Sequence, residues 1–167
     1  LYDVLQQRKD LSVVLDVWEH EPHIDPRLAA RCELVTSHVA GYSLDGKIRG
    51  TELVYQAFCR HFALPVGELP EYPAGQLVSL EAGPTLTAEQ LLLRLSALFY
   101  EPLVDDAALR TTLDLTADKQ AEAFDLLRKN YPERREMPGL RLLLPAGRPD
   151  LEQVARALEL DWAVKAG

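Results

Sequence analysis

Glu21 and His38 are the two side chains whose types and spacing are best suited to chemistry. They lie seventeen positions apart, too far for one helical face but natural for two loops that leave adjacent parallel strands. A carboxylate that accepts a hydrogen bond from one imidazole nitrogen fixes the tautomer and favours the imidazolium, while the other nitrogen can exchange a proton with a substrate. The pair therefore predicts an acid/base function, although a single histidine at a strand end is more often structural.

Two further histidines, His20 and His23, flank Glu21 in the segment HEPH and with His38 allow a metal site. A His-x-x-His pair needs a regular helical turn to bring both rings to one ion, and Pro22 interrupts that turn. No thiolate is near in the sequence. We therefore expect solvated loop histidines and no metal.

Two short strands must position the acid/base pair. Residues 11–17 (LSVVLDV) and 32–37 (CELVTS) are aliphatic and β-branched without alternation, which is typical of parallel strands covered on both faces. Between them, Asp25 and Pro26 predict the N-cap and first position of a short helix. The carboxyl ends of neighbouring parallel strands share one edge, where open α/β sheets bind ligands. Asp16 lies at this edge, and by itself it would be a cap of the backbone turn.

A helix and a boundary are expected next. Residues 51–64 predict a helix after a glycine-rich loop, in which Gly46 and Gly50 are turn glycines. One apolar face of this helix is formed by Val54, Tyr55, Phe58, Cys59 and Phe62. Proline and glycine then concentrate between residues 65 and 83, so the chain is expected to divide there.

The remaining residues predict a small α+β unit. Thr87 and Gln90 form a capping box at the start of a helix that runs to about Tyr100. A second helix carries Phe124, Leu127 and Tyr131, and a third is capped by Asp150. Strands are expected at GLRLLLP and WAVKA.

Composition excludes several partners. The 167 residues carry a formal charge of -8 and a pI near 5.0, which disfavours nucleic acid. Cys32 and Cys59 have no paired spacing, so a reducing cytoplasm fits better than a disulfide framework. No apolar stretch has the length of a membrane span. The chain opens without an initiator Met inside an amphipathic pattern, so we expect a segment before Leu1.

Two blocks of the sequence resemble a known family. VVLDVWEHEP, residues 13–22, followed by LVTSHVAGYSLDGKIRGTELVYQAF, residues 34–58, is similar to the D-2-hydroxyacid dehydrogenases. Their cofactor domain ends in an Asp-Val-aromatic-Glu-x-Glu-Pro block and then a His-x-Ala-Gly segment. Two segments, HVAGYSLDGKIRGT and the later FDLLRKNYPERRE, most resemble one member of this family, whose substrate is phosphorylated. The resemblance implies a homodimeric oxidoreductase that uses NAD and a small phosphorylated hydroxy acid.

The resemblance also implies roles for individual residues. His38 corresponds to the acid/base and Glu21 to its carboxylate partner. Asp16 corresponds to the aspartate beside the nicotinamide carboxamide, Gly41 to a backbone position beside the cofactor, and Tyr42 to a substrate contact. The family's substrate-binding arginine and its dinucleotide fingerprint GxGxxG match no residues here.

A basic cluster stands out in this acidic chain. Arg128, Lys129, Arg134 and Arg135 gather in LRKNYPERR. The simpler interpretation is a solvated helix end, where basic side chains offset the helix dipole. The alternative is that Arg134 and Arg135 bind the substrate phosphate, reaching a neighbouring active site in a dimer.

We therefore predict an α/β protein that is the C-terminal part of a Rossmann-like NAD-binding domain with parallel strands, followed by a small α+β dimerisation domain. The expected parts are residues 1–43 of the NAD-binding domain, a helix at 44–64 returning toward the substrate domain, a linker at 65–76 and the dimerisation domain at 77–167. The alternative function is a non-catalytic dimerisation or regulatory module derived from such an enzyme.

Overall fold

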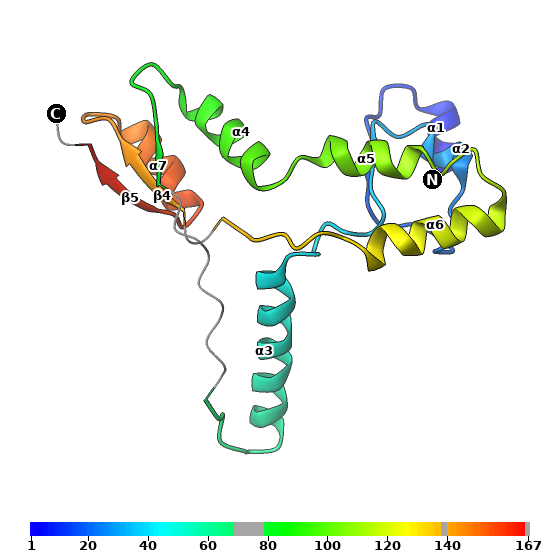
Figure 1. Cartoon of the computed structure of the whole chain (residues 1–167), viewed down its shortest axis with the longest axis horizontal. Helices are drawn as coiled ribbons and strands as arrows, with labels where there is room; N and C mark the ends of the chain where they lie inside the picture. The colour runs from blue at the N-terminus through cyan, green and yellow to red at the C-terminus, as the bar shows by residue number, and fades with distance from the viewer. Residues whose placement is uncertain (69–78, 138–139, 166–167) are drawn as a thin grey trace. The chain divides into compact units, whose positions relative to one another are not determined.

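The computed structural model describes residues 1–68, 79–137 and 140–165, which form two compact units. The first unit contains Leu1–Tyr42 and Glu101–Glu133, and the second contains Ser43–Tyr100 and the chain from Arg134 onward. Figure 1 draws the elements of both units and labels the helices, β4 and β5. The strands of each sheet are parallel, so the predicted α/β class is confirmed.

The first unit begins with the predicted strand, helix and strand. After α1 (Tyr2–Gln7), β1 (Val14–Leu15) pairs in parallel with β2 (Leu34–Val35), and α2 (Pro26–Ala29) connects them. The Asp25 side chain accepts from Arg27 N at the start of α2, as its N-cap prediction requires. The prediction that this strand is covered on both faces is wrong for Val14, which is 67% exposed. Nothing in the described part of this unit packs over its side chain.

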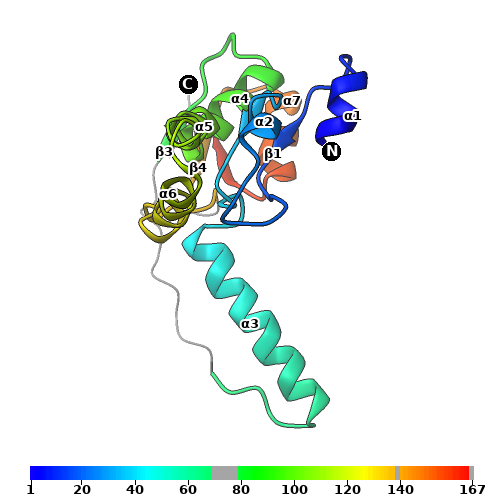
Figure 2. The same ribbon diagram turned by 90° about the vertical axis from the view of Figure 1, so that its right-hand side faces the viewer.

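Two helices from much later in the chain complete the first unit. α5 (Pro102–Arg110) and α6 (Ala117–Lys129) run side by side in Figure 1, and Figure 2 views both nearly end-on. They supply Leu109 and Phe124, both fully buried, to the core around Val35. The further buried members of this core are Leu5, Trp18, Ile24, Leu28, Ala29 and Cys32.

α5 also covers the edge of β2 that β1 leaves open. The Asp106 carboxylate accepts from Val35 N at 2.8 Å and from Arg110 Nε at 2.8 Å. Arg110 Nη2 in turn donates to the carbonyl of Cys32 at 3.0 Å. A backbone donor that a third strand would otherwise satisfy is thus bound by a side chain, so the sheet ends at β2 among the described residues.

The second unit is built on a three-stranded parallel sheet. β3 (Ser79–Glu81), β4 (Arg141–Leu144) and β5 (Asp161–Val164) lie in the order β3-β4-β5. α4 (Ala88–Phe99) and α7 (Pro149–Ala157) pack against each other, and with the strands they bury Leu91, Leu95, Leu142, Leu144 and Leu151. The predicted Thr87 and Gln90 capping box of α4 is confirmed. The Asp150 cap of α7 is wrong: the helix begins at Pro149, and Asp150 pairs with Arg148 in its first turn.

α3 (Leu44–His61) differs most from its prediction, because it replaces much of the expected glycine-rich loop. The Ser43 side chain accepts from Gly46 N, and the helix begins at Leu44, seven residues before the start that periodicity indicated and at the first residue of the expected 44–64 part. Gly46 and Gly50 therefore lie inside the helix. Of the predicted apolar face only Cys59 is buried, while Phe58 is 52% exposed. Periodicity marked a helix face but could not supply the element that would cover it.

The compact units do not follow the predicted domain boundaries. Residues 77–167 were expected to form one domain, whereas α5 and α6 group with Leu1–Tyr42. The predicted linker at 65–76 lies mostly outside the described residues. The four expected parts stay predictions about domains of the whole protein. No helix within the described ranges is both long and apolar enough to cross a membrane.

Candidate active site

Glu21 and His38, predicted from spacing alone, lie together beyond the carboxyl ends of β1 and β2. Glu21 Oε2 is 2.8 Å from His38 Nδ1. The Glu21 side chain is 18% exposed and that of His38 is 42% exposed, so the carboxylate is sheltered while the imidazole reaches solvent. The other ring nitrogen, Nε2, is therefore the one available to a substrate.

Trp18 holds the carboxylate of Glu21 in this position. Its backbone N–H donates to Glu21 Oε1 at 2.7 Å, and its indole Nε1 donates to the carbonyl of Thr36 at 2.8 Å. The indole is buried, so it ties the loop after β1 to the loop after β2. No local sequence pattern marks this hydrogen bond, because it joins residues eighteen positions apart.

Asp16 holds the backbone around His38. Its Oδ1 accepts from Thr36 Oγ1 at 2.6 Å, Val39 N at 2.8 Å and Ala40 N at 3.2 Å. His38 itself has a φ of 58°, a left-handed conformation that costs a residue with a Cβ about 1–3 kcal/mol. Among the described residues, Asp16 thus caps a backbone turn, which was the alternative interpretation of this residue. Its contact with a cofactor stays a prediction.

Gly41 and Tyr42 follow directly in this loop. Gly41 is exposed, and a Cβ added there would meet nothing within 4 Å, so the described protein does not require glycine at this position. Tyr42 is half-buried, and its ring meets that of Tyr131 edge-on with centroids 5.7 Å apart. Their cofactor and substrate contacts stay predictions.

The basic cluster divides: Arg128 and Lys129 lie in the last turn of α6, as the helix-end interpretation predicts, whereas Arg134 and Arg135 lie beyond the helix and belong to the second unit. α6 ends at Lys129, and the backbone of Arg134 forms an isolated parallel β-bridge with Ser43. The Arg135 guanidinium binds Asp45, with Nη2 2.9 Å from Oδ1, and this hydrogen bond holds the pKa of Asp45 below its usual range. The Arg134 guanidinium lies 4.3 Å from the ring centroid of Tyr100. A role of both arginines in phosphate binding stays a prediction.

His20 and His23 are both exposed loop residues, and His23 N donates to the carbonyl of His20 at 2.8 Å. Over residues 1–68, 79–137 and 140–165, no three His, Cys, Asp or Glu side chains are grouped so that they could hold a metal ion.

The fold and the site together define a class: an α/β protein with an imidazole–carboxylate pair at the carboxyl edge of parallel strands, suited to proton transfer on a bound ligand. Comparison with known proteins narrows this class. The chain belongs to the family described as Domain of unknown function (DUF3410), whose model matches residues 71–156, about half of the chain.

Similar curated proteins align with nearly all of the chain, and those described here share the same name. Erythronate-4-phosphate dehydrogenase of Ectopseudomonas mendocina (strain ymp) is 47% identical over 162 residues, 95% of this chain and 43% of the relative. The enzymes of that name from Pseudomonas aeruginosa (strain PAO1) and Azotobacter vinelandii are 45% and 44% identical over 93% and 95% of this chain. The chain thus spans about two fifths of the length of these relatives, and it matches their C-terminal part. The resemblance inferred from the sequence is confirmed.

Proposed function

We propose that this chain is the C-terminal part of an NAD-dependent 4-phosphoerythronate dehydrogenase. The reaction oxidises 4-phospho-D-erythronate at C2 to the 2-oxo acid, 3-hydroxy-2-oxo-4-phosphobutanoate. Support comes from the name that the relatives share and from the 2.8 Å contact between Glu21 and His38, which this chemistry needs. The contact is the observation on which the proposal depends.

His38 acts as the general base. It accepts the C2 hydroxyl proton at Nε2 while the C2 hydrogen leaves as hydride, so the products are the 2-oxo acid, the reduced cofactor and an imidazolium. Glu21 stabilises this imidazolium through Nδ1–H and fixes the tautomer in which Nε2 is the acceptor. When bound, NAD supplies the hydride acceptor. General acid–base catalysis of this kind contributes about 10²–10⁴-fold in rate.

The residues at the strand edge fit a nicotinamide. Among the described residues, Asp16 Oδ2 accepts a single hydrogen bond, from Ala40 N at 3.2 Å, so it retains capacity for a carboxamide N–H. Gly41 leaves open space where a side chain would stand. Asp16 and Gly41 are therefore the residues of this chain that would border the cofactor.

The proposal extends to the setting of the enzyme. The reaction belongs to pyridoxine and pyridoxal 5'-phosphate biosynthesis in the cytoplasm, and residues 77–167 form the homodimer. Sedimentation of the whole protein should give the mass of a dimer. A monomer at the concentrations of the assay would contradict the dimer and leave the chemistry standing.

The whole protein that contains this chain tests the proposal directly. Incubation with 4-phosphoerythronate, NAD and a coupled acceptor should yield the 2-oxo acid. His38→Asn should lower kcat by about 10²–10⁴-fold with little change in NAD affinity. His61→Asn, which changes an exposed histidine of α3, is the matched control. Wild-type turnover by His38→Asn would remove His38 from the mechanism, and an inactive wild type would favour the non-catalytic module.

A further inference from the structure

Tyr42 is fixed at its backbone by the loop that carries His38. Its N–H donates to the carbonyl of Val39 at 2.9 Å, and Val39 N donates to Asp16. These bonds set where the Cα of Tyr42 lies, but they leave the two side-chain torsions of the ring undetermined. The direction of the ring therefore depends on the contacts that the side chain itself makes.

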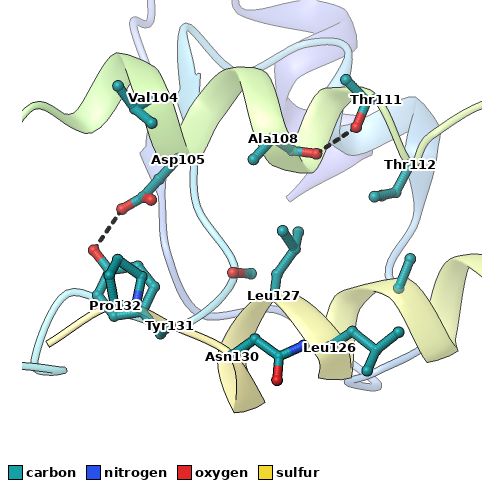
Figure 3. Close-up of a pocket in the computed structure, with 12 residues that line it drawn as sticks. Val104, Asp105, Ala108, Thr111, Thr112, Leu126, Leu127, Asn130, Tyr131 and Pro132 are labelled. Atoms are coloured by element: carbon teal, nitrogen blue, oxygen red, sulfur yellow. Dashed lines mark hydrogen bonds between the residues drawn. The ribbon is translucent and has the colours of Figure 1, made fainter.

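Tyr131 packs against that ring. The two ring planes meet at 82° with centroids 5.7 Å apart, the edge-to-face arrangement that aromatic quadrupoles favour. The Tyr131 hydroxyl donates to Asp105 Oδ2 at 2.8 Å (Figure 3). Figure 3 also shows that Asp105 extends from α5 at one end of a pocket. This pocket has a volume of about 510 Å³ and is lined mainly by residues of α5 and α6 and of the segments that follow them. The ring of Tyr131 is thus held at its far end by a charged acceptor.

The helix that carries Asp105 is itself attached to the strand that leads to His38. The neighbouring residue, Asp106, accepts from Val35 N, and Arg110 donates to the carbonyl of Cys32. The contacts form a closed circuit in the first unit: β2, the His38 loop, Tyr42, Tyr131, Asp105 and back through α5 to β2. All members of this circuit belong to the first unit.

We infer that Tyr131, held by Asp105, is a positioning residue that sets the ring of Tyr42 at the substrate site. The inference rests on the proposed function and on the substrate contact that the family resemblance implies for Tyr42. Tyr131 and Asp105 act through Tyr42 and not through His38, whose carboxylate partner is on another loop. They should therefore affect substrate binding more than the proton transfer.

Steady-state kinetics of the whole protein test this assignment with three variants. Tyr131→Ala removes the ring, and Tyr131→Phe and Asp105→Ala remove only the hydroxyl contact. Tyr131→Ala should raise KM for 4-phosphoerythronate by about three- to tenfold, which is the fold-change that an edge-to-face aromatic pair corresponds to. Tyr131→Phe and Asp105→Ala should raise this KM by a smaller factor. Asp105→Asn should have a KM close to that of the wild type, because the amide oxygen still accepts the hydrogen bond from Tyr131. In all variants kcat, the KM for NAD and the pH profile should stay as in the wild type.

A double-mutant cycle separates positioning from a general loss of structure. If Tyr131 acts through Tyr42, Tyr131→Ala should change KM no further in a Tyr42→Ala background. Tyr55→Phe is the matched control, because it removes a tyrosine hydroxyl that bonds Gly67 N in the second unit. The inference would be overturned if Tyr131→Phe and Asp105→Ala left KM unchanged. It would also be overturned if Tyr131→Ala raised KM by the same factor with and without the Tyr42 ring. An inactive wild type would instead refute the proposed function.

Discussion

Asp16 holds His38 in a left-handed backbone conformation through hydrogen bonds to the residues on either side of it. The carboxylate binds the Thr36 hydroxyl on one side of His38 and the N–H groups of Val39 and Ala40 on the other. With both flanks fixed, the φ of 58° at His38 is imposed by its neighbours, and the imidazole is presented to Glu21. Strain of this kind persists only where surrounding contacts over-determine it, and such contacts concentrate at functional sites.

Loss of the Asp16 carboxylate should therefore affect turnover more than cofactor binding. Asp16→Ala should lower kcat of the whole protein by about a hundredfold, the typical consequence of misplacing a catalytic group by 1 Å. It should also lower the free energy of unfolding by about 2–4 kcal/mol through its lost charge-assisted hydrogen bonds. Calorimetry and steady-state kinetics measure both, and Asp114→Ala, at an exposed aspartate of the same unit, is the control. An unchanged kcat would contradict the role of this anchor in turnover, while a rise in the NAD KM beside the loss of kcat would report the proposed cofactor contact of Asp16.

Removal of the Glu21 charge tests the pair itself. Glu21→Gln keeps the size of the side chain but cannot stabilise an imidazolium, so kcat should fall by about ten- to a hundredfold. The KM for NAD should change little. Glu19→Gln alters a neighbouring exposed carboxylate and should have wild-type kinetics. Equal rates in Glu21→Gln and wild type would mean that the 2.8 Å contact has no part in turnover.

The parts of the fold that sequence could predict are those decided within a few residues. The Asp25 cap with Pro26 and the box of Thr87 with Gln90 are local hydrogen-bond patterns, and both are present. Glu21 and His38 were predicted to meet because strand order fixes the shared edge of two parallel strands. Periodicity placed the start of α3 too late, because Gly46 and Gly50 suggested a loop, whereas the Ser43 cap starts the helix at Leu44.

What sequence could not predict depends on contacts between distant residues. Asp106 meets Val35 N across 71 positions, and Tyr131 meets Tyr42 from beyond the end of α6. Neither segment has a sequence pattern that predicts which distant residue it contacts. Apolar periodicity likewise marked a face of α3 that stays exposed in the described structure, because a pattern gives the face and not what covers it.

The Asp106 and Arg110 pair should make the stability of the first unit depend on pH. Desolvation raises the pKa of Asp106, but the hydrogen bonds from Arg110 and Val35 N outweigh it and leave this pKa below its ordinary value. A carboxyl with a depressed folded pKa contributes stability above its unfolded pKa of about 3.9, and the contribution is lost as pH falls through the folded pKa.

Asp106→Asn should therefore destabilise the protein by about 1.5–3 kcal/mol at neutral pH and by progressively less in acid. Denaturant titrations of both proteins at several pH values measure the difference. Asp125→Asn, at an exposed position of α6, should show no such convergence. A constant difference between wild type and Asp106→Asn from neutral to acid pH would mean that the charge of Asp106 contributes nothing.

Arg134 and Arg135 should separate into different roles when each is replaced by alanine. Arg135 is bound to Asp45, whose pKa its hydrogen bond lowers, and Asp45 Oδ2 also accepts from Glu136 N. Arg135→Ala should thus lower the melting temperature as well as any phosphate affinity. Arg134 lies over the ring of Tyr100, so its removal should have a smaller effect on stability.

If both arginines bind the substrate phosphate, each alanine variant should raise KM for 4-phosphoerythronate by about tenfold or more, since a charge-assisted hydrogen bond is worth about 1.5–3 kcal/mol. Asp45→Asn is the informative companion, because it weakens the hold on Arg135 and leaves both guanidinium groups in place. It should reproduce the loss of stability without the full rise in KM. Unchanged KM in Arg134→Ala and Arg135→Ala would leave the two residues with a structural role, in which Arg135 joins Asp45 at the start of α3 to the segment after α6.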